Sequence, residues 1–197
     1  MKGERRIVPQ DVFEEYADDY DRWFDEHRDE YLEELSRIRK VLPTSDSRSI
    51  EVGVGSGRFA EPLGIRLGVE PSQPLCRMAH KRGIDVIQGK AESLPIKDGS
   101  CSSVLLVTVI CFLDDPITAL SALHRILFPG GFLIIAFIER GKPIHLKYLH
   151  EDGKGRFLSH ARFYSQNEVR TFLEETGFVV IETDSRAGFC VIAARKD

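Results

Sequence analysis

Three glycines at alternate positions form the most distinctive motif of the chain. A predicted strand over 50–53 leads into Gly53, Gly55 and Gly57, and a helical pattern follows from Phe59. Glycine has no Cβ and tolerates positive φ, so this turn lets the backbone come close to a ligand. The amide groups that open the following helix favour negative charge on the bound group. The spacing therefore predicts a ligand-binding turn where a strand ends.

Two acidic residues stand near this turn. Glu51 comes just before it, and Glu70 ends the next predicted strand, over 65–70. A carboxylate at that strand end can accept hydrogen bonds from both hydroxyls of a ribose. The alternative is an exposed charge at a strand end. The G-x-G-x-G spacing differs from the G-x-G-x-x-G fingerprint of dinucleotide-binding proteins, because the third glycine comes one residue early.

Composition limits the classes of protein to consider. The chain has 197 residues, 42% hydrophobic and 29% charged, with a net charge of −4, which suits one globular domain. The absence of a basic tract argues against nucleic-acid binding, and no apolar run approaches the roughly 18 residues of a membrane span. The charged N-terminus does not resemble a signal peptide, so we expect a cytoplasmic protein. The four cysteines are widely spaced, which favours reduced, buried thiols over metal or redox motifs.

An aromatic stripe precedes the glycine turn. Residues 11–42 have helical periodicity, and apolar side chains recur at three- and four-residue spacings at Val12, Phe13, Tyr16, Tyr20, Trp23 and Phe24. Packing against the core accounts for most such stripes. The functional interpretation is a helical lid, residues 1–44, over the ligand end of an α/β core, residues 48–197. Tyr16 and Tyr20 are the residues whose hydroxyls can reach a polar ligand.

Strands and helices alternate through the rest of the chain. Strands are predicted over 84–87, 103–110 and 132–138, with helices opening near Ser72 and after Asp115. Residues 141–160 form the least regular part. A capping box, Ser165 and Glu168, opens a last helix, and residues 178–183 and 189–194 predict a closing hairpin. This order predicts a doubly wound α/β sheet, with ligand at the carboxyl ends of its strands.

The motifs and their order resemble a known family. The matching segments, in sequence, are 51–59, Glu70, 89–95, 125–131 and 163–178. Together they look like the class I S-adenosylmethionine (SAM)-dependent methyltransferases, in the small-molecule branch that carries an A-E-x-L-P motif (methyltransferase type 11-like). The resemblance implies a seven-stranded, mostly parallel, Rossmann-like sheet whose last strand inserts antiparallel.

The resemblance also implies where SAM binds. The glycine turn would approach the methionine part, Glu70 the ribose and residues 71–72 and 91–92 the adenine, while residues 108–109 would pass close to the sulfonium. The full set of implied cofactor-binding residues is Tyr16, Tyr20, Glu51, Gly53, Val54, Gly55, Gly57, Glu70, Pro71, Ser72, Ala91, Glu92, Thr108 and Val109. No metal is implied. The sequence departs from the family at Lys90, where relatives often have an acidic residue that meets the adenine amino group, because lysine cannot accept that hydrogen bond.

The acceptor is less defined than the cofactor. SAM carries its own electrophilic methyl group, so no catalytic residue is assigned and a base is needed only if the nucleophile must lose a proton. Candidate bases or acceptor contacts follow the fifth strand, at Glu139, His145, Tyr148, His150 and His160. A solvated loop with incidental histidines is the alternative. We expect a small-molecule acceptor; a SAM-binding protein without transferase activity and a nicotinamide-dependent oxidoreductase are the rival hypotheses. The sequence carries no signal for oligomeric state.

Overall fold

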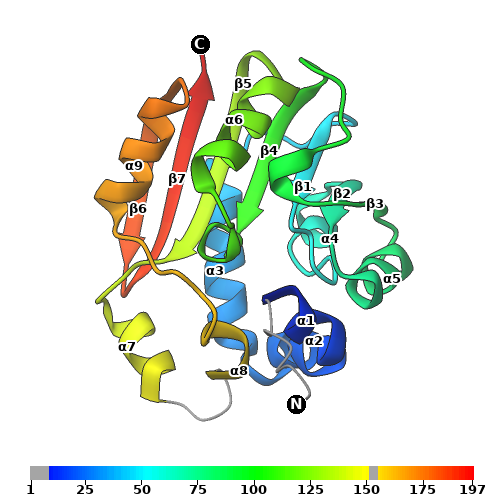
Figure 1. Cartoon of the computed structure of the whole chain (residues 1–197), viewed down its shortest axis with the longest axis vertical. Helices are drawn as coiled ribbons and strands as arrows, with labels where there is room; N and C mark the ends of the chain where they lie inside the picture. The colour runs from blue at the N-terminus through cyan, green and yellow to red at the C-terminus, as the bar shows by residue number, and fades with distance from the viewer. Residues whose placement is uncertain (1–8, 151–154) are drawn as a thin grey trace, which may run out of the picture.

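The computed structural model describes residues 9–150 and 155–197. These residues form a seven-stranded sheet and the helices around it (Figure 1). Its strand order is β3-β2-β1-β4-β5-β7-β6. The strands are β1 (Ser49–Val52), β2 (Leu67–Glu70), β3 (Asp85–Gln88), β4 (Cys101–Val107), β5 (Leu127–Ile138), β6 (Phe178–Arg186) and β7 (Phe189–Lys196). The pairings among β1 to β5 are parallel, whereas β7 is antiparallel to both β5 and β6. The predicted sheet, including its inserted antiparallel last strand, is confirmed.

Helices cover both faces of the sheet and one of its ends. The helices are α1 (Pro9–Glu15), α2 (Ala17–Glu26), α3 (Arg28–Val41), α4 (Ala60–Leu63), α5 (Gln73–Lys81), α6 (Pro116–Ile126), α7 (Pro143–His150), α8 (Gly155–Leu158) and α9 (Gln166–Glu175). Helices α6 and α9 pack on one face, and α3, α4 and α5 on the other. Helices α1, α2, α7 and α8 lie at the end towards which β4 points (Figure 1). This end is where a parallel sheet binds ligand.

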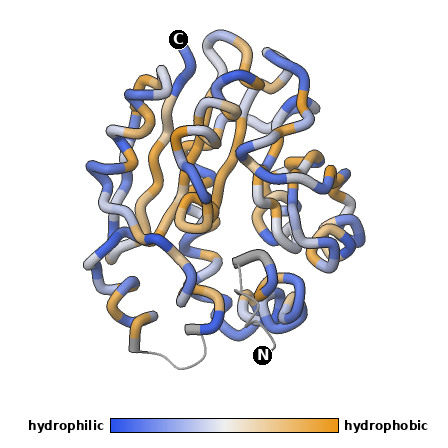
Figure 2. Tube along the Cα trace, in the orientation of Figure 1, coloured by the Kyte–Doolittle hydropathy of each residue, from blue (hydrophilic) through white to orange (hydrophobic). Residues whose placement is uncertain are grey.

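The core has one layer on each face of the sheet. In β4, Val104 and Leu106 pack with α6 and α9, while Leu105 and Val107 face α3 and α4. These side chains are buried, and Figure 2 shows the central strands as a hydrophobic block. Burial on both faces explains the continuous apolar runs of β4 and β5.

The N-terminal segment, predicted to be helical over residues 11–42, forms three helices. The chain leaves helical geometry at Tyr16 (φ −118°, ψ 32°) and again at His27 (φ −117°, ψ 45°). Helix α3 then runs behind the sheet and is fastened there by Arg37, which is 4% exposed. The Arg37 guanidinium donates to Asp184 Oδ2 at 3.0 Å and to the carbonyl of Phe189 at 2.8 Å. A buried arginine therefore joins α3 to the β6–β7 hairpin.

The structure differs from the prediction after β4. The predicted strand runs to residue 110, but β4 ends at Val107, and a 3-10 turn, Ile110–Phe112, follows. Thr108 has φ +52°, an uncommon backbone conformation for a β-branched residue. Its N–H donates to the carbonyl of Ala136 at 2.7 Å, which holds the turn against β5. The chain therefore leaves the sheet at Thr108.

Other boundaries differ less. The predicted irregular part, 141–160, contains α7 and α8, and residues 151–154 lie outside the described residues. Strand β5 starts at Leu127, earlier than expected, across a register irregularity opposite residues 101–103. The capping box of α9 is confirmed, since Ser165 Oγ accepts from the N–H of Glu168 and the Glu168 carboxylate accepts from the N–H of Ser165.

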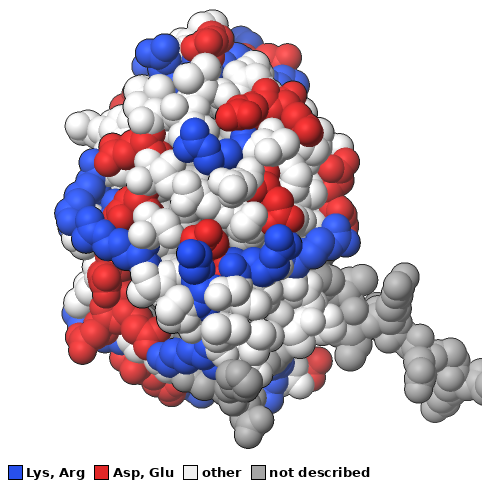
Figure 3. All heavy atoms as spheres, turned by 90° about the vertical axis from the view of Figure 1, so that its left-hand side faces the viewer, with Lys and Arg blue, Asp and Glu red and all other residues white. Residues whose placement is uncertain are grey.

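The surface shows no single-sign field on the face drawn in Figure 3, where acidic and basic side chains alternate. Within the described residues, no helix combines the length and the apolar character needed to cross a membrane.

Arg37 provides a test of this packing. Arg37→Ala removes a donor from the part-buried Asp184 carboxylate, which keeps Arg186, and from the Phe189 carbonyl, so we expect a loss of about 2 kcal/mol in the free energy of unfolding, measured by urea denaturation. Arg39→Ala on the same helix, where the side chain is exposed, should change it by about 0.5 kcal/mol or less. Equal effects of the two substitutions would contradict this account.

Candidate functional site

The glycine turn leaves no room for side chains. The N–H groups of Gly53 and Val54 both donate to the carbonyl of Val69, at 2.7 and 3.0 Å, which ties the turn to β2. Gly53 has φ +73°, and a Cβ there would lie 2.2 Å from Val109 Cγ2. Gly55 has φ +55°, and a Cβ there would lie 2.9 Å from Tyr20 Oη. The residue types at these positions follow from backbone conformation and from contact with the residues above the turn.

Glu70 joins the turn to the next strand end. The N–H of Gly55 donates to Glu70 Oε2 at 3.0 Å, and the N–H of Ser72 donates to Glu70 Oε1 at 2.9 Å. Burial raises the pKa of the Glu70 carboxyl to about 7, although the two amide hydrogen bonds act in the opposite direction. Each carboxylate oxygen has two lone pairs, so each retains a site for a further donor.

Glu51 lies beneath the turn, at the end of β1. It is 2% exposed, and one of its oxygens accepts from the N–H of Ala60, at the start of α4. Within the described residues its Oε2 has no hydrogen-bond partner. Burial raises the pKa of Glu51 well above its usual value, and the nearby Glu70 carboxylate adds to the shift. The structure therefore holds a buried acidic oxygen whose hydrogen-bonding capacity is unused.

Tyr20, on α2, covers the glycine turn from the other side. Its ring packs edge-on against Phe13 and Phe24, at centroid distances of 5.5 and 5.4 Å. Burial raises the pKa of Tyr20, and the carboxylates of Glu70 and Glu51 raise it further. Its hydroxyl therefore stays protonated at neutral pH.

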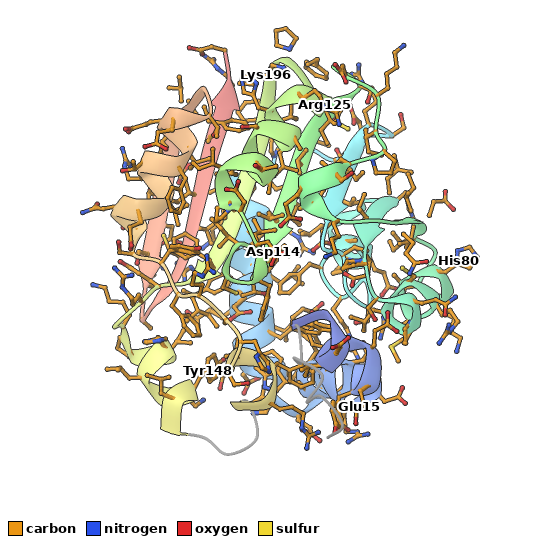
Figure 4. The ribbon with its side chains drawn as sticks, in the orientation of Figure 1. Glu15, His80, Asp114, Arg125, Tyr148 and Lys196 are labelled. Carbon is orange, nitrogen blue, oxygen red and sulfur yellow. The ribbon has the colours of Figure 1, made fainter. Side chains whose placement is uncertain are left out.

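A cavity of about 210 Å³, cavity 1, opens between the turn and this tyrosine. Residues predicted to bind cofactor that line it are Tyr20, Gly53, Gly55, Glu70, Pro71, Ala91, Glu92, Thr108 and Val109. Further lining residues, which the sequence did not single out as cofactor-binding, are Phe13, Leu75, Gly89, Lys90, Val107, Phe112, Leu113 and Asp114. Phe13 belongs to the aromatic stripe, and Gly89 and Lys90 to a matching segment. No sequence pattern pointed to residues 112–114 as site residues, because it is the turn after β4 that brings them to cavity 1. Figure 4 places Asp114 near the lower end of β4.

Five predicted residues do not line cavity 1, namely Tyr16, Glu51, Val54, Gly57 and Ser72. Tyr16 lies at the start of α2. The guanidinium carbon of Arg156 lies over the Tyr16 ring, 4.0 Å from the ring centroid. Val54 packs over Gly68 in the core. Gly57 and Ser72 support the site from outside, the former against Ala79 and the latter as the N-cap of α5.

A second cavity, cavity 2, of about 450 Å³, adjoins the first. The two share four lining residues, Phe13, Tyr20, Thr108 and Phe112. Aromatic side chains form one part of the rest of its wall, with Trp23, Phe24, Phe59, Tyr148 and Phe157. Charged side chains also line it, and Asp19 pairs there with Arg22 at 3.0 Å and with Arg156 at 3.2 Å.

Of the candidate bases, Tyr148 lines cavity 2. Its hydroxyl donates to Glu30 Oε2 at 3.4 Å, and Figure 4 shows it on α7. Glu139 is buried elsewhere, accepting from Ser185 Oγ at 2.9 Å, and His145 and His160 do not line either cavity. The side chain of His150 lies outside the described residues. His27 also lines cavity 2 and stacks on Trp23 at 4.7 Å between ring centroids.

Comparison with known proteins identifies the family. A model of the methyltransferase domain matches residues 50–135. The solved structure of a SAM-dependent methyltransferase from Thermotoga maritima, described as a possible histamine N-methyltransferase, superposes with a TM-score of 0.88 and 38% identity, covering 96% of this chain and 100% of that one. An uncharacterized protein of Methanocaldococcus jannaschii is 39% identical over 85% of this chain and 80% of its own length.

A third relative, an uncharacterized protein of Mycobacterium tuberculosis, is 33% identical over 82% of this chain but only 58% of its own length. This chain thus spans less than two thirds of the mycobacterial protein, whereas it covers the Thermotoga maritima chain completely. The glycine turn and Glu70 lie within the part that the domain model matches. The chain belongs to the SAM-dependent methyltransferases.

Proposed function

We propose that this protein transfers a methyl group from SAM, bound in cavity 1, to a small molecule bound in cavity 2. The observation that carries the proposal is the shared wall, because Phe13, Tyr20, Thr108 and Phe112 line both cavities. Two ligands that meet at this wall can bring reacting atoms within about 3–3.5 Å, the contact that a bimolecular displacement requires. Family membership also argues against the oxidoreductase alternative.

The residues of cavity 1 fit SAM. Glu70 Oε1 and Oε2 each have a further acceptor site for a ribose hydroxyl. Glu51 lies beneath the turn and does not line the cavity, so it acts on this site through the turn. The glycine turn provides a cradle that a Cβ at Gly53 or Gly55 would fill. When bound, SAM supplies a methyl group made electrophilic by a positively charged sulfur.

The adenine end of cavity 1 has an acidic group despite the family departure at Lys90. Lys90 and Ala91 line the cavity, and Asp114 and Glu92 line it too. The N–H of Asp114 donates to Glu92 Oε1 at 3.0 Å, which holds the Asp114 backbone at the cavity. We assign the Asp114 carboxylate as an acceptor for the adenine amino group, a role that the ammonium of Lys90 cannot take.

Cavity 2 suits a compact acceptor with a ring. Its volume of about 450 Å³ falls in the range of roughly 300–1,000 Å³ typical of small-molecule sites. Ring faces and edges from Phe13, Trp23 and Phe157 offer stacking surfaces and keep water from the shared wall. The description of the Thermotoga maritima relative as a possible histamine N-methyltransferase agrees with an acceptor of this size.

The chain's contribution to the reaction is positioning. The rings at the shared wall orient the acceptor and exclude water, and the strained turn at Thr108 fixes where the two cavities meet. The side chains of cavity 2 that can exchange a proton with an acceptor, should its nucleophile carry one, include Tyr148, His27 and the carboxylates of Asp19, Glu26 and Glu34.

The close packing around the glycine turn predicts that alanine at Gly53 and alanine at Gly64 have different effects on cofactor binding. Gly53→Ala should weaken binding of S-adenosylhomocysteine (SAH), measured by calorimetry, by about tenfold or more, because the new Cβ meets Val109 at 2.2 Å. Gly64 has a similar φ of +75° but nothing within 4 Å of its Cβ position. Gly64→Ala should therefore lower stability by about 1 kcal/mol while leaving the dissociation constant unchanged. Equal loss of SAH binding in both variants would refute the claim that SAH binding needs the space at Gly53.

The raised pKa of Glu70 predicts that cofactor binding depends on pH. Its pKa of about 7 means that the protonated form predominates below pH 7, and this form accepts hydrogen bonds less well. SAH affinity should fall by about tenfold for each pH unit below 7 and level off above it. Glu70→Gln should bind weakly with a much flatter profile. An SAH dissociation constant in the parent protein that does not change between pH 5.5 and 8 would rule out this role.

The acceptor assignment is tested by a panel of small amines, phenols and thiols that carry aromatic rings, with SAH formation as the readout. We expect turnover with at least one class. Phe157→Ala, in cavity 2 alone, should then raise the acceptor KM by about tenfold and leave SAH binding unchanged. Turnover on RNA or protein but on no small molecule would contradict the proposed acceptor.

A further inference from the structure

An arginine directly after the glycine turn is bound to the lid helix α2. Arg58 Nε donates to Asp21 Oδ1 at 2.9 Å, and its Nη2 donates to Asp21 Oδ2 at 2.8 Å. Its two Nη groups also donate to the carboxylate oxygens of Asp25, at 2.8 and 2.7 Å. Residues four apart on a helix share a face, so both carboxylates of α2 point to one guanidinium.

A second arginine completes the connection. Arg82, the C-cap of α5, donates to Asp21 Oδ2 at 2.9 Å and to the carbonyl of Ser56, within the glycine turn, at 2.8 Å. Asp21 therefore bridges two arginines from different elements. We call Asp21, Asp25, Arg58 and Arg82 the lid clamp.

The lid clamp has favourable electrostatics. Burial alone would raise the pKa of Asp21, but hydrogen bonds from Arg58 and Arg82 outweigh burial and hold that pKa well below its usual range. Arg58 and Asp21 are each about four-fifths buried, with side chains 17% and 20% exposed. Hydrogen bonds between charged groups in such a place are stronger than those between neutral groups.

The clamp holds the residue that covers the site. Tyr20 precedes Asp21 on α2, and its hydroxyl is 2.9 Å from the Cβ position of Gly55. Cavity 1, at about 210 Å³, is smaller than the roughly 300 Å³ at which typical small-molecule sites begin. Tyr20 lines this cavity, so its position limits the room for a ligand of SAM's size. The sheet wall is packed core. Helix α2 contributes Phe24 to that core, and its opposite contact with the turn consists of the ion pairs from Asp21 and Asp25, which fix where Tyr20 lies.

We propose that the lid clamp sets the position of Tyr20 over the cofactor and thereby sets how fast the cofactor product leaves. This inference rests on the proposed binding of SAM in cavity 1. Arg58, Arg82, Asp21 and Asp25 are positioning residues, because they act through α2 and Tyr20. The clamp separates while ligand enters or leaves and reforms once the site is filled.

The chain carries its own reporter for this motion. Trp23 is the only tryptophan in the sequence, and it lies on α2 two residues from Asp21. Its fluorescence, followed by stopped flow on mixing with SAH and on displacement of bound SAH, gives the association and dissociation rate constants. Calorimetry on the parent protein establishes SAH binding separately. Absence of binding there would overturn the proposed function itself.

The decisive variant is Asp21→Asn, which removes the charge that both arginines share. We expect the SAH dissociation rate constant to rise about tenfold or more, with an association rate constant that is unchanged or higher. Arg58→Lys keeps the charge but loses the planar fork, so its effect should be intermediate. Asp98→Asn is the matched control, because Asp98 pairs with Arg125, which Figure 4 shows at the far end of the sheet from α2. This control should release SAH at the parent rate.

Two further measurements keep the inference falsifiable if Asp21→Asn folds poorly. In the parent protein, raising the salt concentration from 0.05 to 1 M should accelerate SAH release, because the clamp is partly exposed and is screened. In a double-mutant cycle, Asp25→Asn and Arg58→Lys should have less than additive effects on the release rate, because Asp25 accepts from Arg58. Release rates unchanged in folded Arg58→Lys, and insensitive to salt in the parent, would overturn the clamp while leaving SAH binding intact.

Discussion

The contact between the Glu70 carboxylate and two backbone amides holds this site together. The N–H groups of Gly55 and Ser72 come from the ends of two neighbouring parallel strands, and one carboxylate fastens both. Burial raises the pKa of the Glu70 carboxyl to about 7, although both amides donate to it. Glu70 thus fastens the glycine turn to the end of β2, and each of its oxygens retains an acceptor site.

The remaining elements position walls around this contact. The sheet provides a rigid edge, because β1 and β4 are buried on both faces. The turn after β4 leaves the sheet at Thr108 and contributes Phe112 and Asp114 to cavity 1. Helices α1 and α2 bring Phe13 and Tyr20 from the other side. Cavities 1 and 2 therefore share a wall, half from the sheet edge and half from helices α1 and α2, and the function proposed above places both reactants against it.

Local sequence patterns predicted most of the fold. They also predicted the site positions that backbone conformation constrains. The glycine spacing and the acid at the end of the second strand are readable because φ and strand order constrain those positions. Tyr16 and Tyr20 would share a face of one continuous helix, but the break at Tyr16 gives the two residues different surroundings, with Tyr20 at the turn and Tyr16 beneath Arg156. Phe112 and Asp114 were not predictable as site residues, because their positions depend on a single left-handed residue, Thr108, that no local pattern specifies.

A crystal structure with SAH bound is the most direct test of the claim that two ligand sites meet at one wall. The account predicts the ribose hydroxyls at Glu70 and the sulfur at the wall formed by Phe13, Tyr20, Thr108 and Phe112, facing cavity 2. A sulfur directed away from that wall, or SAH bound outside cavity 1, would contradict it.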